Sequence, residues 1–335
     1  MLVLVDLSNL VEVIILNDGR PNVDKRLEQD LLLNKSQILK NGCLIDFSTE
    51  SNYYLKGTKD EHDIFTSIHT ILDNVGIPAD LVHFCTGNLL NKQNYNTYTG
   101  LKTAEDSNFL PFKSAFYKDF WCTQTLAMHK DYSINYTKTN KPKYFSCLNG
   151  RERDHRAYTK AYLERHNLLD KGVCTFVWQG VSVDGYTTPE DITSHTVQPD
   201  NFYKVFDDTY YDVITETLTG EESNYIGIRH RGGYKWWQEV FITEKTWKAF
   251  LYATPCLVYG SPNVEKKLAG YGFKFPSKSN YDHLQGNTRV KAMVDFLKQE
   301  HDIQELKEIA EHNFNLAWDK KYLVNLFVEH IRKGQ

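Results

Sequence analysis

The sequence predicts an α/β protein of two domains, and three observations lead to this fold class. The chain has 335 residues, which is too long for one ordinary domain and fits two domains of about 150 residues each. Apolar strand-like runs alternate with helical stretches in both halves, as in parallel sheets. A polar stretch without apolar periodicity, Asp131–Lys143, separates the two series. This order fits two Rossmann-like domains that face one another, over residues 1–135 and 143–315, followed by a C-terminal helix over 316–335 that could cross back to the first domain.

The N-terminal half shows strand, helix and strand in succession. Met1–Leu7 and Cys43–Phe47 are apolar runs typical of buried strands. Asp63–Val75 predicts a helix with one apolar face, made of Ile64, Ile68, Ile71 and Leu72. Gly76 and Pro78 end this helix, and Asp80–Thr86 predicts the next strand. The order indicates a βαβ unit.

The C-terminal half repeats the alternation after the polar stretch. Strands are predicted at Lys143–Leu148, Val173–Trp178, Tyr211–Thr217 and Cys256–Tyr259. Helices are predicted at Asp154–His166, Thr243–Tyr252 and, for the most part, Ile303–Ile331.

Composition limits the function classes. No apolar run reaches the roughly 20 residues of a membrane span, and Met1–Ile15 lacks the features of a secretory signal. The six cysteines are scattered without metal-ligand spacing, which favours the reducing cytoplasm and a soluble protein without a metal site. The net charge of −4 gives no global sign of nucleic-acid binding, although a local basic face could still serve it.

One basic motif lies between a predicted strand and a predicted helix. Asn149–Arg156 holds four basic groups, namely Arg151, Arg153, His155 and Arg156. Ligands of open α/β sheets bind at the carboxyl ends of strands, and helix starts attract anions. The arginine fork matches phosphate oxygens. We therefore expect anion binding here, with Arg151 first, while Asp154 caps the helix; a solvated first turn is the alternative.

A second motif starts the helix at Phe241–Lys248 and follows a strand that ends near Glu216. Thr243 is expected to cap this helix, with Trp247, Phe250 and Leu251 on its buried face. Lys245 opposes the helix dipole unless a phosphate lies there, and a Glu244 carboxylate can accept from two ribose hydroxyls. The same residues could be an ordinary exposed helix start.

A third motif, Gly227–Lys235, carries Arg229 and Arg231 ahead of two glycines. Such a loop could close over phosphates or an acceptor, or be a surface turn.

Two blocks of the chain resemble a known family. FITEKTWKAFLYATPCLVYGSPNVEKKLAGYGFKF is similar to the donor-site region of GT-B glycosyltransferases, especially α-1,3-fucosyltransferases and phage-encoded enzymes. KYFSCLNGRERDHRAYTKAYLERHNLLDKG and the later VITET resemble the phage group. The resemblance covers roughly Lys143–Phe275, and the N-terminal half matches by organisation only.

The resemblance implies a glycosyltransferase that takes a sugar from a UDP- or GDP-linked donor and has no obligatory metal or other cofactor. It implies Glu244 on the ribose, Lys245 on the diphosphate and Arg151 on the same diphosphate, with Arg153 second. His155, Glu216 and Thr243 complete the expected donor site.

The catalytic base and the acceptor are less defined. If the reaction inverts, Asp6 and Asp106 in the N-terminal domain are the candidates for the base. The base-bearing block of fucosyltransferases has no counterpart here. The phage resemblance suggests DNA with a hydroxymethylated pyrimidine as acceptor and, for a phage-encoded enzyme, action in the host cytoplasm. A glycan or a small molecule remains an alternative acceptor.

Two other classes stay open. LVDLSN at the N-terminus suggests a metal-dependent nuclease or phosphoesterase, which would need further carboxylates. A non-catalytic module that binds nucleotide-sugars would use the same Lys245 and Arg151.

Overall fold

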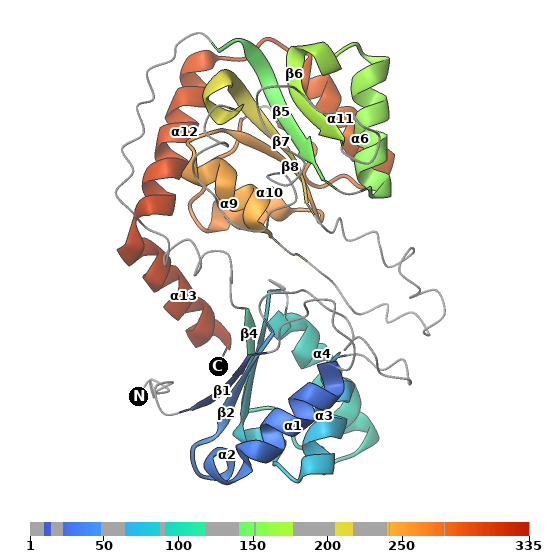
Figure 1. Cartoon of the computed structure of the whole chain (residues 1–335), viewed down its shortest axis with the longest axis vertical. Helices are drawn as coiled ribbons and strands as arrows, with labels where there is room; N and C mark the ends of the chain where they lie inside the picture. Colours follow the sequence, from blue (N-terminus) through green and yellow to red (C-terminus); the bar gives the residue numbers. More distant parts are fainter. Residues whose placement is uncertain are drawn as a thin grey trace. The chain divides into compact units, whose positions relative to one another are not determined.

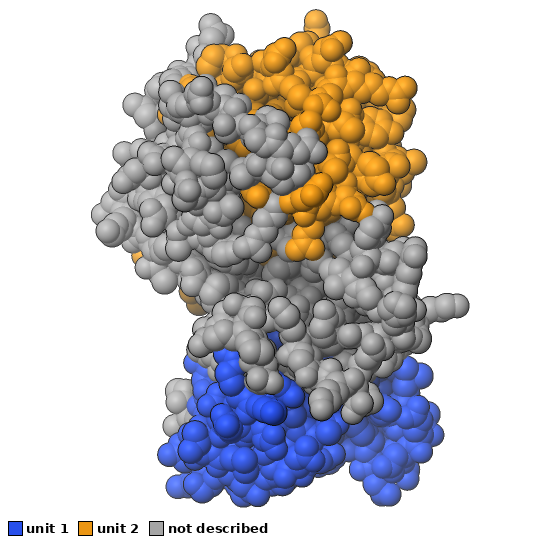
Figure 2. Space-filling model, turned by 45° about the vertical axis from the view of Figure 1, so that its right-hand side comes forward, with its two compact units in different colours: residues 1–120, 227–239, 327–335 blue, residues 121–226, 240–326 orange. Residues whose placement is uncertain are grey.

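The computed structural model describes residues 10–14, 23–47, 64–87, 91–117, 141–150, 152–176, 205–216, 240, 242–277 and 279–334. Contacts divide the chain into two compact units, coloured in Figure 2. Unit 1 comprises residues 1–120, 227–239 and 327–335, and unit 2 comprises residues 121–226 and 240–326.

Unit 1 is a parallel sheet with helices between its strands (Figure 1). Its described elements are β1 (Val11–Ile14), α1 (Val23–Leu33), α2 (Lys35–Asn41), β2 (Cys43–Phe47), α3 (Ile64–Val75), a 3₁₀ turn (Ala79–Leu81), β3 (Val82–Thr86), α4 (Asn91–Glu105) and β4 (Ser114–Tyr117). The strands follow the order β1-β2-β3-β4, and every neighbouring pair is parallel.

The core of unit 1 confirms the predicted apolar face of α3. Ile64, Ile68, Ile71 and Leu72 are all buried. Gly76 follows the helix with φ +67°, a conformation that favours glycine. Aromatic rings extend this core, and Phe112 stacks on both His69 and Tyr95.

Unit 2 is a second parallel sheet, with strand order β6-β5-β7-β8. Its described elements are β5 (Lys143–Asn149), α6 (Asp154–Arg165), a 3₁₀ turn (Leu169–Lys171), β6 (Gly172–Phe176), β7 (Thr209–Thr215), α9 (Glu244–Leu251), β8 (Cys256–Tyr259), α10 (Val264–Gly270), α11 (Gly286–Leu297), α12 (Ile303–Trp318) and α13 (Lys320–Gly334). The unit boundary at Leu326 falls inside α13.

Helices cover both faces of the sheet of unit 2 (Figure 1). α6 packs with α11, and α9 packs with α12. Strand residues alternate between these faces: Phe145 and Tyr211 join the core with α11, whereas Ser146 and Asp212 point to the opposite face and bond each other at 2.8 Å. Both faces are therefore buried, as expected for a parallel sheet.

The structure confirms the α/β class and two parallel sheets. Strand and helix bounds differ from the prediction by a few residues, and the C-terminal region is two helices rather than one, interrupted at Asp319. The Asp319 carboxylate accepts from the amide of Tyr322 at 3.0 Å and so caps the second helix. The predicted strand Met1–Leu7 lies outside the described residues.

The described cysteines are buried in the two sheets. Cys43, Cys85, Cys147, Cys174 and Cys256 are all free and buried, and each lies in a strand. Burial raises the pKa of the Cys43 and Cys147 thiols to about 12, so both behave as small apolar side chains.

Candidate anion-binding site

The strand order of unit 2 creates a topological switch point between β5 and β7. From β5 the chain moves to one side to form β6, and β7 then lies on the other side of β5. Helices on the two sides of such a point diverge, which leaves a crevice at the carboxyl ends of the two strands. Asn149 ends β5 and Glu216 directly follows β7, so the candidate residues of the sequence analysis gather at this edge.

A buried carboxylate organises the start of α9 at this edge. The Glu216 side chain has no exposed surface. Its carboxylate accepts from the Thr243 amide at 3.1 Å, from the Thr243 hydroxyl at 2.5 Å and from the Thr246 hydroxyl at 2.6 Å. A buried charge needs such donors to offset the loss of water. Glu216 therefore positions the helix start, and its role in donor binding stays a prediction.

Thr243 in turn contacts Lys245. The Thr243 hydroxyl oxygen accepts from the Lys245 amide at 3.4 Å and from its ammonium at 3.1 Å. Thr243 is the N-cap of α9, as predicted, and Trp247, Phe250 and Leu251 are buried, also as predicted. The ammonium of Lys245 is thus held beside the positive end of the helix dipole. The two positive charges repel each other, and a bound anion would relieve this repulsion.

The start of α6 differs from the prediction. The N-cap is Arg153, with φ −151° and ψ 149°, and Asp154 is the first helical residue. The expected cap by Asp154 is therefore wrong by one position, and the carboxylate instead complements the helix dipole in the first turn. The Arg153 side chain is partly exposed.

His155 does not contribute a charge to this site. Burial, together with the charge of Arg156, lowers its pKa to about 3, although a hydrogen bond with the Glu216 carbonyl acts in the opposite direction. That bond joins Nε2 to the carbonyl at 2.9 Å, so a neutral imidazole with the proton on Nε2 satisfies it. His155 fixes the end of β7 rather than binding anions.

Arg156 also donates hydrogen bonds to carbonyls at the end of β7. It is buried, and its guanidinium donates to the carbonyls of Thr215 at 3.3 Å and Glu216 at 3.5 Å. Of the predicted basic cluster, this leaves Arg153 as the described arginine whose side chain reaches solvent.

Two cations stand at the helix starts of this strand edge. Arg153 precedes α6 and Lys245 lies in the first turn of α9, and both charges lower the pKa of the His155 imidazole. The site therefore combines two helix starts, an arginine and a lysine at one strand edge. Such an arrangement can bind phosphate oxygens.

No sequence motif indicated the hydrogen bonds that join the ends of neighbouring strands. The Thr215 hydroxyl donates to the Asn149 side-chain oxygen, and the Asn149 amide donates to the Thr175 hydroxyl at 3.1 Å. Thr246, the third donor to Glu216, was also missed. These partners are distant in sequence, so no local pattern identifies them.

Several predicted residues cannot be located. Asp6, Arg151, Arg229 and Arg231 lie outside the described residues, as does the side chain of Glu244. The helical backbone of α9 begins at Glu244, next to the Thr243 cap.

Asp106 lies in unit 1, directly after α4 and ahead of β4. Its carboxylate accepts from the Asn108 amide at 2.9 Å, and the side chain is exposed. The segment thus leads to the amino end of a strand, the edge opposite to that where ligands of parallel sheets bind. This position argues against Asp106 as the catalytic base.

Comparison with protein-family models, characterised proteins and solved structures gave no match. Among the described residues, no group of three or more His, Cys, Asp or Glu side chains could hold a metal ion. None of the helices in the described part of the chain is long and apolar enough to cross a membrane.

Proposed function

We propose that the protein is a glycosyltransferase that moves a sugar from a nucleotide-sugar to an acceptor hydroxyl. The observation that supports its donor side is the position of Arg153, Lys245 and two helix starts at the β5–β7 switch point. A nucleoside diphosphate is the ligand class that best uses two cations and the amides of two helix starts.

The proposed roles follow from the position of each group. Lys245 and Arg153 neutralise the diphosphate, and Glu216 with Thr243 holds Lys245 in place. The resemblance to GT-B enzymes adds Glu244 as the acceptor of ribose hydroxyls and Arg151 as a further cation on the diphosphate. The geometry supports the binding of a diphosphate, and only the resemblance supports the transfer of a sugar.

The chemistry of the proposed reaction explains the need for fixed cations. As the bond between the anomeric carbon and the diphosphate oxygen breaks, its electron pair remains on the diphosphate. Preorganised cations stabilise this developing charge in the transition state. The acceptor oxygen forms the new bond to the anomeric carbon, and its proton passes to a base. Asp6 remains the proposed base, since the position of Asp106 is unfavourable.

The acceptor is proposed from the resemblance alone. DNA with a hydroxymethylated pyrimidine is the first candidate, which would place the reaction in the host cytoplasm for a phage enzyme. The net charge of −4 favours a glycan or small molecule as the alternative.

A thermal-shift screen of the full chain tests the donor side. UDP, GDP and their sugar conjugates should raise the melting temperature without added divalent metal, because a ligand that binds the native state stabilises it. Mass spectrometry then shows which conjugate transfers its sugar to hydroxymethylated DNA or to a glycan. If divalent metal alone shifts melting and no nucleotide does, a metal-dependent nuclease or phosphoesterase becomes the better account.

A further inference from the structure

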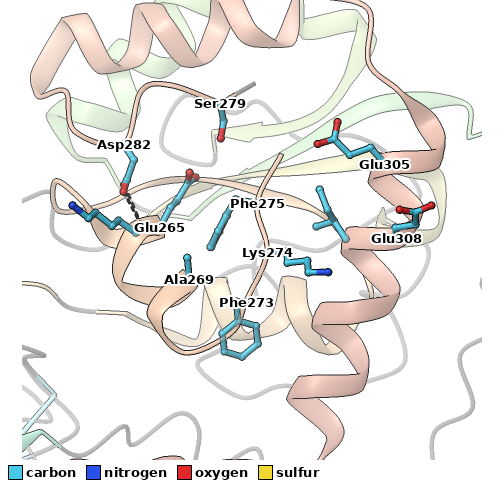
Figure 3. Close-up of a pocket in the computed structure, with 11 residues that line it drawn as sticks. Glu265, Ala269, Phe273, Lys274, Phe275, Ser279, Asp282, Glu305 and Glu308 are labelled. Carbon is cyan, nitrogen blue, oxygen red and sulfur yellow. Dashed lines mark hydrogen bonds between the residues drawn. The ribbon is translucent and has the colours of Figure 1, made fainter. Parts of the chain in front are cut away.

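Unit 2 contains a pocket that shares no residue with the candidate anion-binding site. Its volume is about 550 Å³, within the range of small-molecule sites. α10, the loop from Phe273 to Asp282 and α12 form its walls (Figure 3). The residues that matter for its chemistry are Glu265, Phe273, Phe275, Glu305 and Glu308.

A buried carboxyl group with one open oxygen lines this pocket. Glu265 is only 4% exposed. Its Oε1 accepts from the Val258 amide at 2.9 Å and from the Tyr281 hydroxyl. Within the described part of the chain, no group donates to Oε2. In Figure 3 the Glu265 carboxyl points toward the side of the pocket where Phe275 and Ser279 lie.

The neighbouring carboxylate, in contrast, is fully engaged. Asp282 accepts from the Arg289 guanidinium at 3.0 Å and from the amides of Glu265 at 3.1 Å and Lys266 at 2.9 Å. Arg289 also donates to the carbonyls of Gly260 and Val258, both at 2.9 Å, and to neither oxygen of Glu265. Asp282 thus has an internal counter-ion bonded to it, and Glu265 does not.

The remaining walls suit a flat or apolar body that carries a positive charge. Phe275 is partly exposed, so its ring can contact an apolar group, whereas the Phe273 ring is buried and stacks on Phe250. Glu305 and Glu308 add carboxylates on the α12 side, and Lys266 and Lys274 lie among the exposed lining residues. Burial raises the pKa of Glu265 to about 8, whereas the hydrogen bonds from Tyr281 and Val258 and the nearby charge of Arg289 act in the opposite direction.

We propose that this pocket binds a small organic cation, an amidinium or guanidinium on a flat apolar body, which donates to Oε2 of Glu265. A charged donor paired with a buried carboxylate forms a short, strong hydrogen bond, and the partly exposed Phe275 ring contacts the apolar body. The inference does not depend on the glycosyltransferase proposal.

Calorimetry on the full chain with benzamidine tests this proposal, with benzamide as the neutral probe of nearly the same shape. The titration is run at about pH 9, where a carboxyl with a pKa of about 8 is mostly ionised. We expect benzamidine to bind at least about tenfold more tightly than benzamide, because the hydrogen bond involves two charges.

Glu265→Gln keeps an oxygen that accepts from the Val258 amide and the Tyr281 hydroxyl. It replaces the open Oε2 by an NH2 group, which cannot accept a hydrogen bond from the cation. It should weaken benzamidine binding at least about tenfold. Glu311→Gln, an exposed change on α12 outside the pocket, should leave binding unchanged. Absence of benzamidine binding, equal binding of benzamide, or full binding by Glu265→Gln would overturn the proposal. If Glu265→Gln does not fold, the comparison of the two probes on the native chain decides.

Discussion

The carboxylate of Glu216 accepts two hydrogen bonds from Thr243, one from its amide at 3.1 Å and one from its hydroxyl at 2.5 Å. The two residues are 27 positions apart, at the end of β7 and the start of α9. Because the same hydroxyl oxygen accepts from the Lys245 ammonium, the buried Glu216 carboxylate helps to position this partly buried lysine. The proposed diphosphate site therefore depends on a contact that involves no ligand.

Removal of the Thr243 hydroxyl should destabilise the protein. Thr243→Ala loses a helix cap and leaves one oxygen of the Glu216 carboxylate without its donor. We expect a loss of about 2–4 kcal/mol in the free energy of unfolding, measured by urea denaturation. Thr243→Ser keeps the hydroxyl and should cost less than about 1 kcal/mol. Equal losses for the two variants would show that the hydrogen bonds are unimportant.

Arg153 and Arg156 should respond oppositely to truncation. Arg156→Ala removes a donor from the carbonyls of Thr215 and Glu216, of which Glu216 keeps its bond with His155, and should cost about 1–3 kcal/mol of stability. Arg153→Ala should change stability by less than about 0.5 kcal/mol, since its side chain is partly exposed. In the folded protein, Arg153→Ala should weaken UDP or GDP binding about tenfold, as the loss of one charged hydrogen bond predicts. A stable Arg156→Ala protein, or unchanged nucleotide affinity in Arg153→Ala, would contradict this division.

The contribution of two buried carboxyl groups to stability should fall as the pH rises from about 5 to 8. Burial raises the pKa of Glu265 to about 8 and that of Asp212 to about 7. The unfolded chain releases these protons near pH 4, so over this window the two folded carboxyls bind more protons and their contribution falls with rising pH. Below about pH 6.5 the buried His69, His83 and His155 act in the opposite direction, because burial lowers their pKa values. Each group contributes a slope of at most about 1.4 kcal/mol per pH unit.

Glu265→Gln isolates one of these two contributions. The variant should show a flatter pH dependence of the unfolding free energy than the native chain, and it should gain stability relative to the native chain toward pH 8. Glu311→Gln is the matched surface control. Urea unfolding at several pH values measures both slopes, and identical slopes would mean that Glu265 titrates normally.

The sequence predicted those helices and strands whose apolar pattern and end signals lie within one short segment. β8 matches the prediction Cys256–Tyr259, and α3 matches in its apolar face and its glycine end. α4 was missed because its buried face consists mainly of Asn and Tyr residues rather than an aliphatic stripe. β4 was missed because Ser114–Tyr117 (SAFY) lacks the Leu–Val pair that marks β8 (CLVY), a strand of the same length.

The candidate site was predictable only in part. Lys245 and Arg153 stand at helix starts, and a basic residue there is visible in the sequence. The internal roles of His155 and Arg156 depend on carbonyls about 60 residues away, so the sequence suggested four similar basic groups. Glu265 lies in the charged run VEKKLAG, which is typical of an exposed helix, and only tertiary packing buries it.

The most direct test of the central claim is calorimetric titration of UDP and GDP into the native chain and Lys245→Ala. The account predicts that at least one nucleotide binds the native chain and that Lys245→Ala weakens this binding by about 1.5–3 kcal/mol, the range for a charged hydrogen bond. Lys291→Ala, which removes an exposed lysine paired with Asp295, should bind like the native chain. Unchanged nucleotide affinity in Lys245→Ala would remove this lysine from the site and contradict the account.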